Sequence, residues 1–201
     1  QSSAAIASVR HCVQVDHPDA EDNVMQVVLN HAVDLAALRR NLFASSSCGI
    51  CGKASIEQAS TNRVVEDTVR LTPADLYALP GRLEAEQAGF AATGGVHAAA
   101  LFDTSLETIA IREDIGRHNA VDKVLGVAAT KRRAGAVLMV SGRVSFEIVQ
   151  KALACGVELV AAVSAPSSLA VDLAGESGMT LVAFLRDTRM CVYSAGHRIQ
   201  A

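Results

Sequence analysis

The sequence predicts an α/β protein built on a largely parallel sheet with helices on both faces. From about residue 109 onward, short apolar runs alternate with segments of helical periodicity, which is typical of parallel strands joined by crossover helices. Half of the 201 residues are apolar and only 3% are aromatic. Small aliphatic side chains can therefore fill a core between a sheet and the helices that cover it.

The second half of the chain carries the clearest pattern. The predicted strands are 109–111, 136–140, 158–163, 180–185 and 190–194. The predicted helices are 119–132, 145–156 and 167–178. Because only a short turn separates the last two strands, we expect them to pair as a hairpin.

The first half is less regular. Its predicted elements are strands at 6–15 and 24–29, helices at 35–43 and 72–87, and a glycine turn leading into a strand over 92–103. Thr72 can cap the helix at 72–87 and Pro73 suits its first turn, whereas Pro80 is expected to break it in two. Since no repeat or change of composition divides the chain, we predict one domain over residues 1–201.

Composition and charge exclude several classes of protein. The net charge is −3 and the longest basic run is the triplet at 131–133, so no nucleic-acid surface is indicated. The apolar-leaning stretch 156–173 is interrupted by Glu158, Pro166 and Asp172, so it does not predict a membrane span. The chain begins at Gln1 without a secretory leader, and we expect a cytoplasmic protein that lacks an upstream segment.

The motif "SSSCGICGK" places Cys48 and Cys51 two residues apart among serines and glycines. A structural zinc site needs four ligands, and the other cysteines (Cys12, Cys155 and Cys191) are single and lie in patterns that suggest core positions, so we predict no metal site. Lys53 would favour the thiolate form of a nearby cysteine. Two chemistries remain open on these residues alone, namely thioredoxin-like disulfide exchange and carriage of a sulfane sulfur.

Polar residues follow several of the predicted strands. Arg117 and His118 follow the first strand of the second half, Arg143 follows the next in "SGR", and small hydroxyls follow the third in "SAPSS". These turns are expected at one edge of the sheet, where helix N-termini favour anions, so they predict a phosphate-bearing ligand. No glycine-rich dinucleotide or P-loop motif is present. His97 could be a ligand or a base, but because it enters an apolar strand it is interpreted as a core histidine.

Six stretches in order resemble the FdhD family, the formate dehydrogenase accessory sulfurtransferases. They are "SSCGICGKASIE", "GGVHAAALFD", "REDIGRHNAVDKVLG", "SGRVSFEIVQKA", "SAPSSLAVDLA" and "FLRDTRMCVYS". The resemblance implies a cytidine-deaminase-like layered sandwich. Deaminase chemistry is not expected, because His97 is followed by Ala98 and Ala99 rather than by the glutamate of the H-x-E motif. Family members usually carry a further N-terminal segment.

The resemblance also implies the function. It points to a cytoplasmic sulfur carrier, an accessory sulfurtransferase rather than a metabolic enzyme. Such a carrier takes sulfur from an L-cysteine desulfurase of the IscS type as a persulfide on Cys48, with Cys51 as second thiol, and delivers it to the molybdenum cofactor of formate dehydrogenase. We expect no tightly bound metal, no nucleic-acid or membrane partner, and a homodimer.

The resemblance further points to "FLRDTR" as a binding segment for the guanine-dinucleotide form of that cofactor. The predicted cofactor-binding residues are Arg117, His118, Arg143, Phe184, Leu185, Arg186, Asp187, Thr188 and Arg189. Independently of the resemblance, Arg186 and Arg189 in a turn between strands can pair with a pyrophosphate. The alternative is a simple hairpin turn in which Asp187 bridges an arginine.

Overall fold

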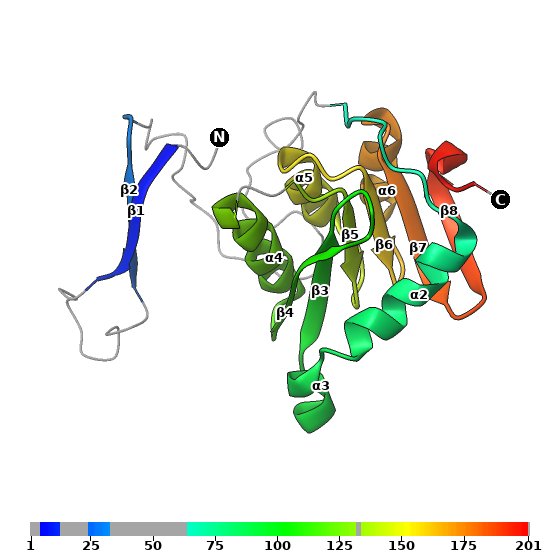
Figure 1. Cartoon of the computed structure of the whole chain (residues 1–201), viewed down its shortest axis with the longest axis horizontal. Coiled ribbons are helices and arrows are strands. Elements are labelled where there is room, and N and C mark those ends of the chain that lie inside the picture. Colours follow the sequence, from blue (N-terminus) through cyan, green and yellow to red (C-terminus); the bar gives the residue numbers. More distant parts are fainter. Residues whose placement is uncertain (1–4, 13–23, 33–63, 132–133, 201) are drawn as a thin grey trace. The chain divides into compact units, whose positions relative to one another are not determined.

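The computed structural model describes residues 5–12, 24–32, 64–131 and 134–200. The chain divides into two compact units, Gln1–Asn41 and Leu42–Ala201 (Figure 1). In the first unit, β1 (Ile6–His11) pairs with β2 (Met25–Leu29) in antiparallel orientation, and both strands were predicted. The predicted helix at 35–43 lies outside the described residues. The prediction of one domain over residues 1–201 stays a prediction.

The second unit is built on a six-stranded sheet in the order β4-β3-β5-β6-β7-β8. The strands are β3 (His97–Phe102), β4 (Thr108–Asp114), β5 (Val137–Val140), β6 (Leu159–Ala162), β7 (Thr180–Arg186) and β8 (Arg189–Ser194). Only β5–β6 and β6–β7 are parallel pairs, whereas β4–β3, β3–β5 and β7–β8 are antiparallel. The sheet is mixed, so the prediction of a largely parallel sheet was wrong for β3 and β4, whereas the hairpin predicted for the last two strands is confirmed as β7–β8. Short turns join β3 to β4 and β7 to β8, and a short turn can only return the chain antiparallel.

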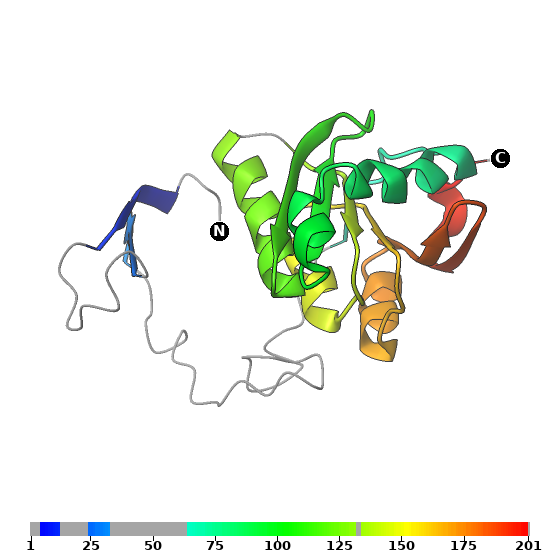
Figure 2. The same cartoon turned by 90° about the horizontal axis from the view of Figure 1, so that it is seen from below.

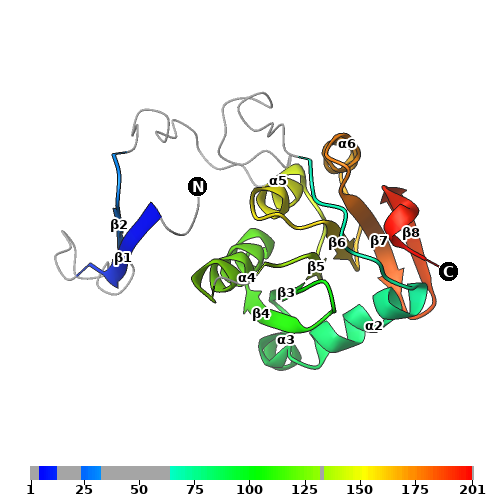
Figure 3. The same cartoon turned by 45° about the horizontal axis from the view of Figure 1, so that its top comes forward.

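Helices cover both faces of this sheet, as predicted (Figure 3). They are α2 (Pro73–Glu84), α3 (Ala88–Thr93), α4 (Arg117–Lys131), α5 (Phe146–Ala154) and α6 (Ser168–Glu176), followed by the short 3-10 helix η3 (Gly196–Arg198). Figure 2 shows α2 and α3 on the side of the sheet opposite to α5 and α6. Among the described residues, no helix is long and apolar enough to cross a membrane.

The core follows from the alternation of side chains along each strand. In β5, Leu138 and Val140 pack with α4, α5 and α6, while Val137 and Met139 face the opposite cluster with α2. All four side chains are almost fully buried. A strand that is buried on both faces consists of a continuous run of apolar residues, which is why the sequence predicts β5, β6 and β7.

Helix α2 begins where the sequence predicts but does not break at Pro80. Thr72 and Asp75 form a capping box, and Pro73 occupies the first turn. The helix continues through Pro80 because Leu76, Leu79 and Leu83 are all buried against the sheet. Their burial outweighs the one backbone hydrogen bond that a proline cannot make.

Candidate functional site

Four polar turns meet at one edge of the sheet. Strands β5, β6 and β7 run in parallel and therefore end at the same edge. Strand β3 runs against β5 and against β4, so its first residue, His97, lies at this edge opposite Asp114, the last residue of β4. The turns at 115–117, 141–143, 164–167 and 187–188 thus come together although they are far apart in the sequence.

The middle of this edge is packed tightly around Gly142. A Cβ atom on Gly142 would lie only 3.2 Å from Nδ1 of His97 and 3.7 Å from Cβ of Arg117. A larger residue would push these side chains apart. Glycine at this position therefore lets the turn after β5 approach both the start of β3 and the first turn of α4.

Arg117 offers a donor at this point. Its Nε atom is buried and has no hydrogen-bond partner among the described residues. A buried guanidinium nitrogen is normally paired, because leaving it unpaired costs free energy. Arg117 can therefore supply a hydrogen bond to an anionic ligand, as the sequence predicts. Arg143 lies on the same turn as Gly142 and is exposed.

Unlike Nε of Arg117, both ring nitrogens of His118 have partners. Its Nε2 lies 2.8 Å from Oγ of Ser145, and its Nδ1 lies 3.2 Å from Oε2 of Glu147. Burial, followed by the charges of Arg117 and Lys151, lowers the pKa of His118 to about 4 against the opposing charge of Asp122. Both ring nitrogens are thus engaged by residues at the start of α5, and His118 can meet a ligand only by giving up one of these contacts.

The segment from Phe184 to Arg189 forms the end of β7 and its turn into β8. Nη1 of Arg186 donates to the carbonyl oxygens of Val163, at 2.8 Å, and Leu185, at 3.1 Å. Arg186, Asp187, Thr188 and Arg189 are all exposed, whereas Leu185 is buried. Within the described residues, Asp187 makes no ion pair with an arginine. The alternative of a hairpin turn bridged by this aspartate is therefore not what the structure forms.

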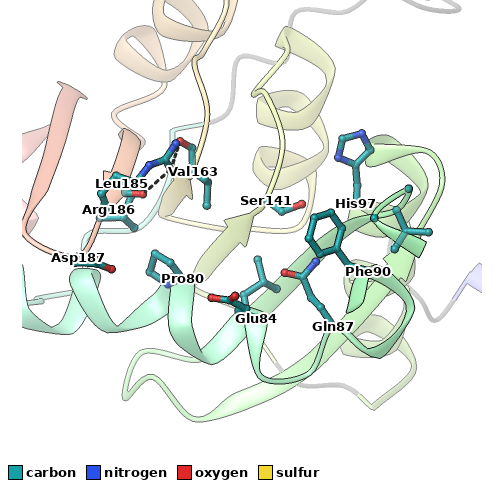
Figure 4. A pocket seen from close by; sticks show the side chains of 14 residues that line it. Pro80, Glu84, Gln87, Phe90, His97, Ser141, Val163, Leu185, Arg186 and Asp187 are labelled. Carbon is teal, nitrogen blue, oxygen red and sulfur yellow. Dashed lines mark hydrogen bonds between the residues drawn. The ribbon is translucent and has the colours of Figure 1, made fainter. Parts of the chain in front are cut away.

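Two cavities open beside this segment. One, of about 550 Å³, is lined by residues of α2 and α3, by His97 and Ser141, and by Leu185, Arg186 and Asp187. Figure 4 shows Pro80, Glu84 and Gln87 on one side of this cavity and Arg186 across from them. The other cavity, of about 330 Å³, is lined by Phe184, Arg186, Arg189, Met190 and Cys191. Arg186 borders both.

Sequence reasoning missed part of this lining. His97 is half-buried and borders the larger cavity, so its interpretation as a core histidine was wrong. Ser141 was noticed only as part of a turn, and its hydroxyl accepts a hydrogen bond from the N–H of Ala98 at 2.9 Å. The lining residues of α2 and α3 could not be predicted from the sequence, because only the tertiary fold brings these helices to the ends of the strands.

The cysteines divide into two groups. Cys48 and Cys51 lie outside the described residues, so their predicted role stays a prediction. Cys155 and Cys191 are exposed and Cys12 is half-buried, so the core positions predicted for them were wrong. Cys155 directly follows the last residue of α5, and Cys191 lies on β8, which is the last strand in the sheet that the described residues form. Among the described residues, no group of three His, Cys, Asp or Glu side chains could hold a metal ion.

Comparisons with known proteins identify relatives along the chain. A family model described as the FdhD/NarQ family matches residues 1–200. A sulfur carrier protein FdhD from Streptomyces avermitilis is 55% identical over 169 residues, which cover 81% of this chain and 60% of that protein. A sulfur carrier protein FdhD from Mycolicibacterium paratuberculosis is 46% identical over 203 residues, covering 96% of this chain and 75% of the relative. The chain thus spans only 60% of the length of the Streptomyces relative.

A solved structure shares the fold. It is a protein from Desulfotalea psychrophila described as a formate dehydrogenase accessory protein, and it matches with a TM-score of 0.72 at 24% identity. The match covers 99% of this chain and 73% of the other. At this identity the likeness supports the mixed α/β fold and nothing about chemistry.

Proposed function

The chain belongs to the FdhD/NarQ family, and from this premise we propose that it is a sulfur carrier in the maturation of formate dehydrogenase. The observation that carries the proposal is the family match over residues 1–200, which includes both thiols of the C-x-x-C motif. Relatives named sulfur carrier protein FdhD support the same role.

In the proposed reaction, Cys48 carries the sulfur. Its thiolate attacks the outer sulfur of a persulfide on an L-cysteine desulfurase. A new S–S bond forms on Cys48 while the donor's own S–S bond breaks and the donor cysteine leaves as a thiolate. Lys53, five residues further on, favours the attacking thiolate. No oxidant is consumed, because the sulfane sulfur is only passed from one thiol to another.

The molybdenum cofactor of formate dehydrogenase is the proposed acceptor, bound as a client at the strand edge. The described residues suit an anionic guanine-dinucleotide group. Arg117 has a buried nitrogen without a partner in the described chain, Arg143 is exposed, and Arg186 and Arg189 border the two cavities. Guanidinium groups pair well with phosphate oxygens. Glu84 and Asp187 line the larger cavity, so phosphates are expected on the arginine side of the edge.

The same proposal includes the setting of the protein. We place it in the cytoplasm as a homodimer that docks to a desulfurase donor and a formate dehydrogenase acceptor. Its layers correspond in this proposal to a cytidine-deaminase-like sandwich, which the helices on both faces of the sheet support. In sulfur transfer it acts as an accessory sulfurtransferase rather than as a metabolic enzyme.

Intact-mass measurement after incubation with a desulfurase and cysteine tests the carrier step. We expect a gain of one sulfur atom, located on Cys48 and absent from Cys48→Ala. The exposed thiols Cys155 and Cys191 provide matched controls, and Cys155→Ala and Cys191→Ala should both keep the gain. Sulfur gain that survives in Cys48→Ala would overturn the assignment. Efficient reduction of insulin disulfides without any sulfur gain would favour a thioredoxin-like oxidoreductase.

A further inference from the structure

Three side chains of α4 and the start of α5 form a hydrogen-bonded line that the sulfur-carrier proposal does not use. It runs from Glu147 through His118 to Ser145, with one imidazole nitrogen facing each partner at 3.2 and 2.8 Å. A hydroxyl, an imidazole and a carboxylate in this order make up the unit by which hydrolases activate a serine. Both distances are close to the range expected for such a unit.

The protonation state of His118 suits a general base. Its surroundings are Arg117 and Asp122 on its own helix and Glu147 and Lys151 on α5. Burial and the two cations keep the pKa of His118 at about 4, so the ring is neutral at neutral pH. A neutral ring carries one N–H, and the carboxylate of Glu147 fixes it at Nδ1. Nε2 is then the acceptor for the hydroxyl proton of Ser145.

Ser145 is held in an unusual way for its position in the helix. It is the N-cap of α5, yet its hydroxyl makes no capping hydrogen bond. Ser167, the N-cap of α6, accepts a hydrogen bond from the N–H of Ala170 in the usual manner. A serine cap is typically worth about 1 kcal/mol. The two serines are both N-caps, but the hydroxyl of Ser167 caps its helix whereas the hydroxyl of Ser145 is directed to His118.

The start of α5 also carries backbone N–H groups of the kind that bind an oxyanion. The N–H groups of the first helical residues, Phe146 and Glu147, have no acceptor within the helix. Serine hydrolases commonly use the N–H that follows the nucleophile for this purpose. Ser145 itself is only 5% exposed, which restricts access to small groups.

We propose that Ser145, His118 and Glu147 form a serine nucleophile centre that accepts small acyl groups from activated esters. In this reaction Oγ of Ser145 bonds to the carbonyl carbon while its proton moves to Nε2 of His118. The bond to the leaving alcohol breaks, and the alcohol departs with that proton. Water then attacks the acyl-serine, gives a proton to Nε2, and releases the carboxylic acid as the proton returns to Ser145. No oxidant or further co-reactant is needed.

Labelling of the purified full chain with a small alkyl fluorophosphonate tests this centre directly. The reagent bonds to Oγ and loses fluoride, and peptide mass spectrometry locates the adduct. We expect the adduct on Ser145, none on Ser167, and none in Ser145→Ala. His118→Ala should slow labelling by about 100-fold or more, because it removes the general base. Ser167→Ala, which loses an ordinary cap, serves as the matched control and should label at the normal rate.

The pH dependence of the labelling rate distinguishes a catalytic role of Glu147, His118 and Ser145 from a purely structural one. An active base must be neutral, so the labelling rate of the wild type should stay level down to about pH 5 and fall as the pH approaches the value near 4 at which His118 gains a proton. Absence of an adduct on Ser145 in folded protein, or a rate unchanged in His118→Ala, would overturn the proposal. The contact would then be a polar link between α4 and α5 and nothing more.

Discussion

At the residue scale, two buried charges tie the segment before α2 to the last residues of the described chain. Glu158 is 3% exposed and accepts hydrogen bonds from the N–H groups of Thr68, at 2.7 Å, and Val69, at 3.0 Å. Arg198 is 2% exposed, lies 3.4 Å from Glu158, and donates to the carbonyl oxygens of Glu66 and Gly178. The segment before α2 and the last residues of the chain are thereby tied to the same edge of the sheet.

Removing Arg198 should destabilise the protein. We expect Arg198→Ala to lower the free energy of unfolding by about 3–5 kcal/mol, because Glu158 would be left as a buried charge without its cation. Urea unfolding at pH 7 measures this. Arg112→Ala removes an exposed arginine and should change the free energy of unfolding by less than about 0.5 kcal/mol. Equal effects of the two substitutions would contradict the role of the buried pair.

The same pair predicts how stability responds to acid. Burial on its own raises the pKa of Glu158, but the hydrogen bonds from Thr68 and Val69, together with the charge of Arg198, outweigh it and hold the pKa below its ordinary value of 4.5. The contribution of Glu158 to stability is therefore present above about pH 4.5 and lost as the pH falls through the lowered pKa. The difference between wild type and Arg198→Ala should shrink over that range, because protonation removes the unpaired charge.

At the element scale, α2 shows how a local signal and the tertiary fold combine. The hydroxyl of Thr72 accepts from the N–H of Asp75 at 3.2 Å, and Asp75 accepts in return from the N–H of Thr72 at 2.8 Å. Both bonds come from residues three apart, so the start of the helix could be predicted. Its passage through Pro80 could not, because it depends on leucines that meet strands far along the chain.

Thr72→Ala should weaken this helix start. It removes the hydroxyl that caps the first turn, and we expect a loss of about 1 kcal/mol in the free energy of unfolding. Thr72→Ser keeps the hydroxyl and should retain most of the stability. Thermal unfolding of the three proteins side by side provides the comparison. A serine variant as unstable as the alanine variant would show that the methyl group of Thr72 matters more than the cap.

The strands show the limit of local patterns. The apolar runs of β5, β6 and β7 predict their position because both faces of these strands are buried. Their direction relative to β3 depends on the route of α4, which carries the chain from β4 at the sheet edge past β3 to β5. No run of residues encodes that route on its own, and the alternation of strands and helices alone suggested parallel neighbours everywhere except in the hairpin of the last two strands.

At the scale of the whole molecule, the predicted convergence of polar turns holds because strands β5, β6 and β7 share a direction. Arg117, Arg143 and Arg186 could therefore be placed at one edge from the sequence. The sequence could not show which other side chains of the fold surround the polar residues at this edge. The engagement of His118 by α5, and the position of Glu84 from α2 across the larger cavity from Arg186, arise from contacts across the fold.

This arrangement leads to a prediction about ligand binding at the β7–β8 turn. Arg186 borders both cavities and Arg189 borders one, and hydrogen bonds from guanidinium to phosphate contribute about 1.5–3 kcal/mol each. Guanosine diphosphate, used as a fragment of the cofactor, should therefore bind about tenfold or more weakly to an Arg186→Ala, Arg189→Ala variant in a calorimetric titration. An Arg70→Ala, Lys131→Ala variant removes the same charge from exposed positions outside both cavities and serves as the control.

A loss of affinity shared by both variants would indicate a general effect of net charge, whereas unchanged affinity in the Arg186→Ala, Arg189→Ala variant would remove this turn from the binding site. A loss confined to the first variant would mean that the arginines hold the phosphates directly, and the affinity should then fall as salt is added, because exposed charge pairs are screened.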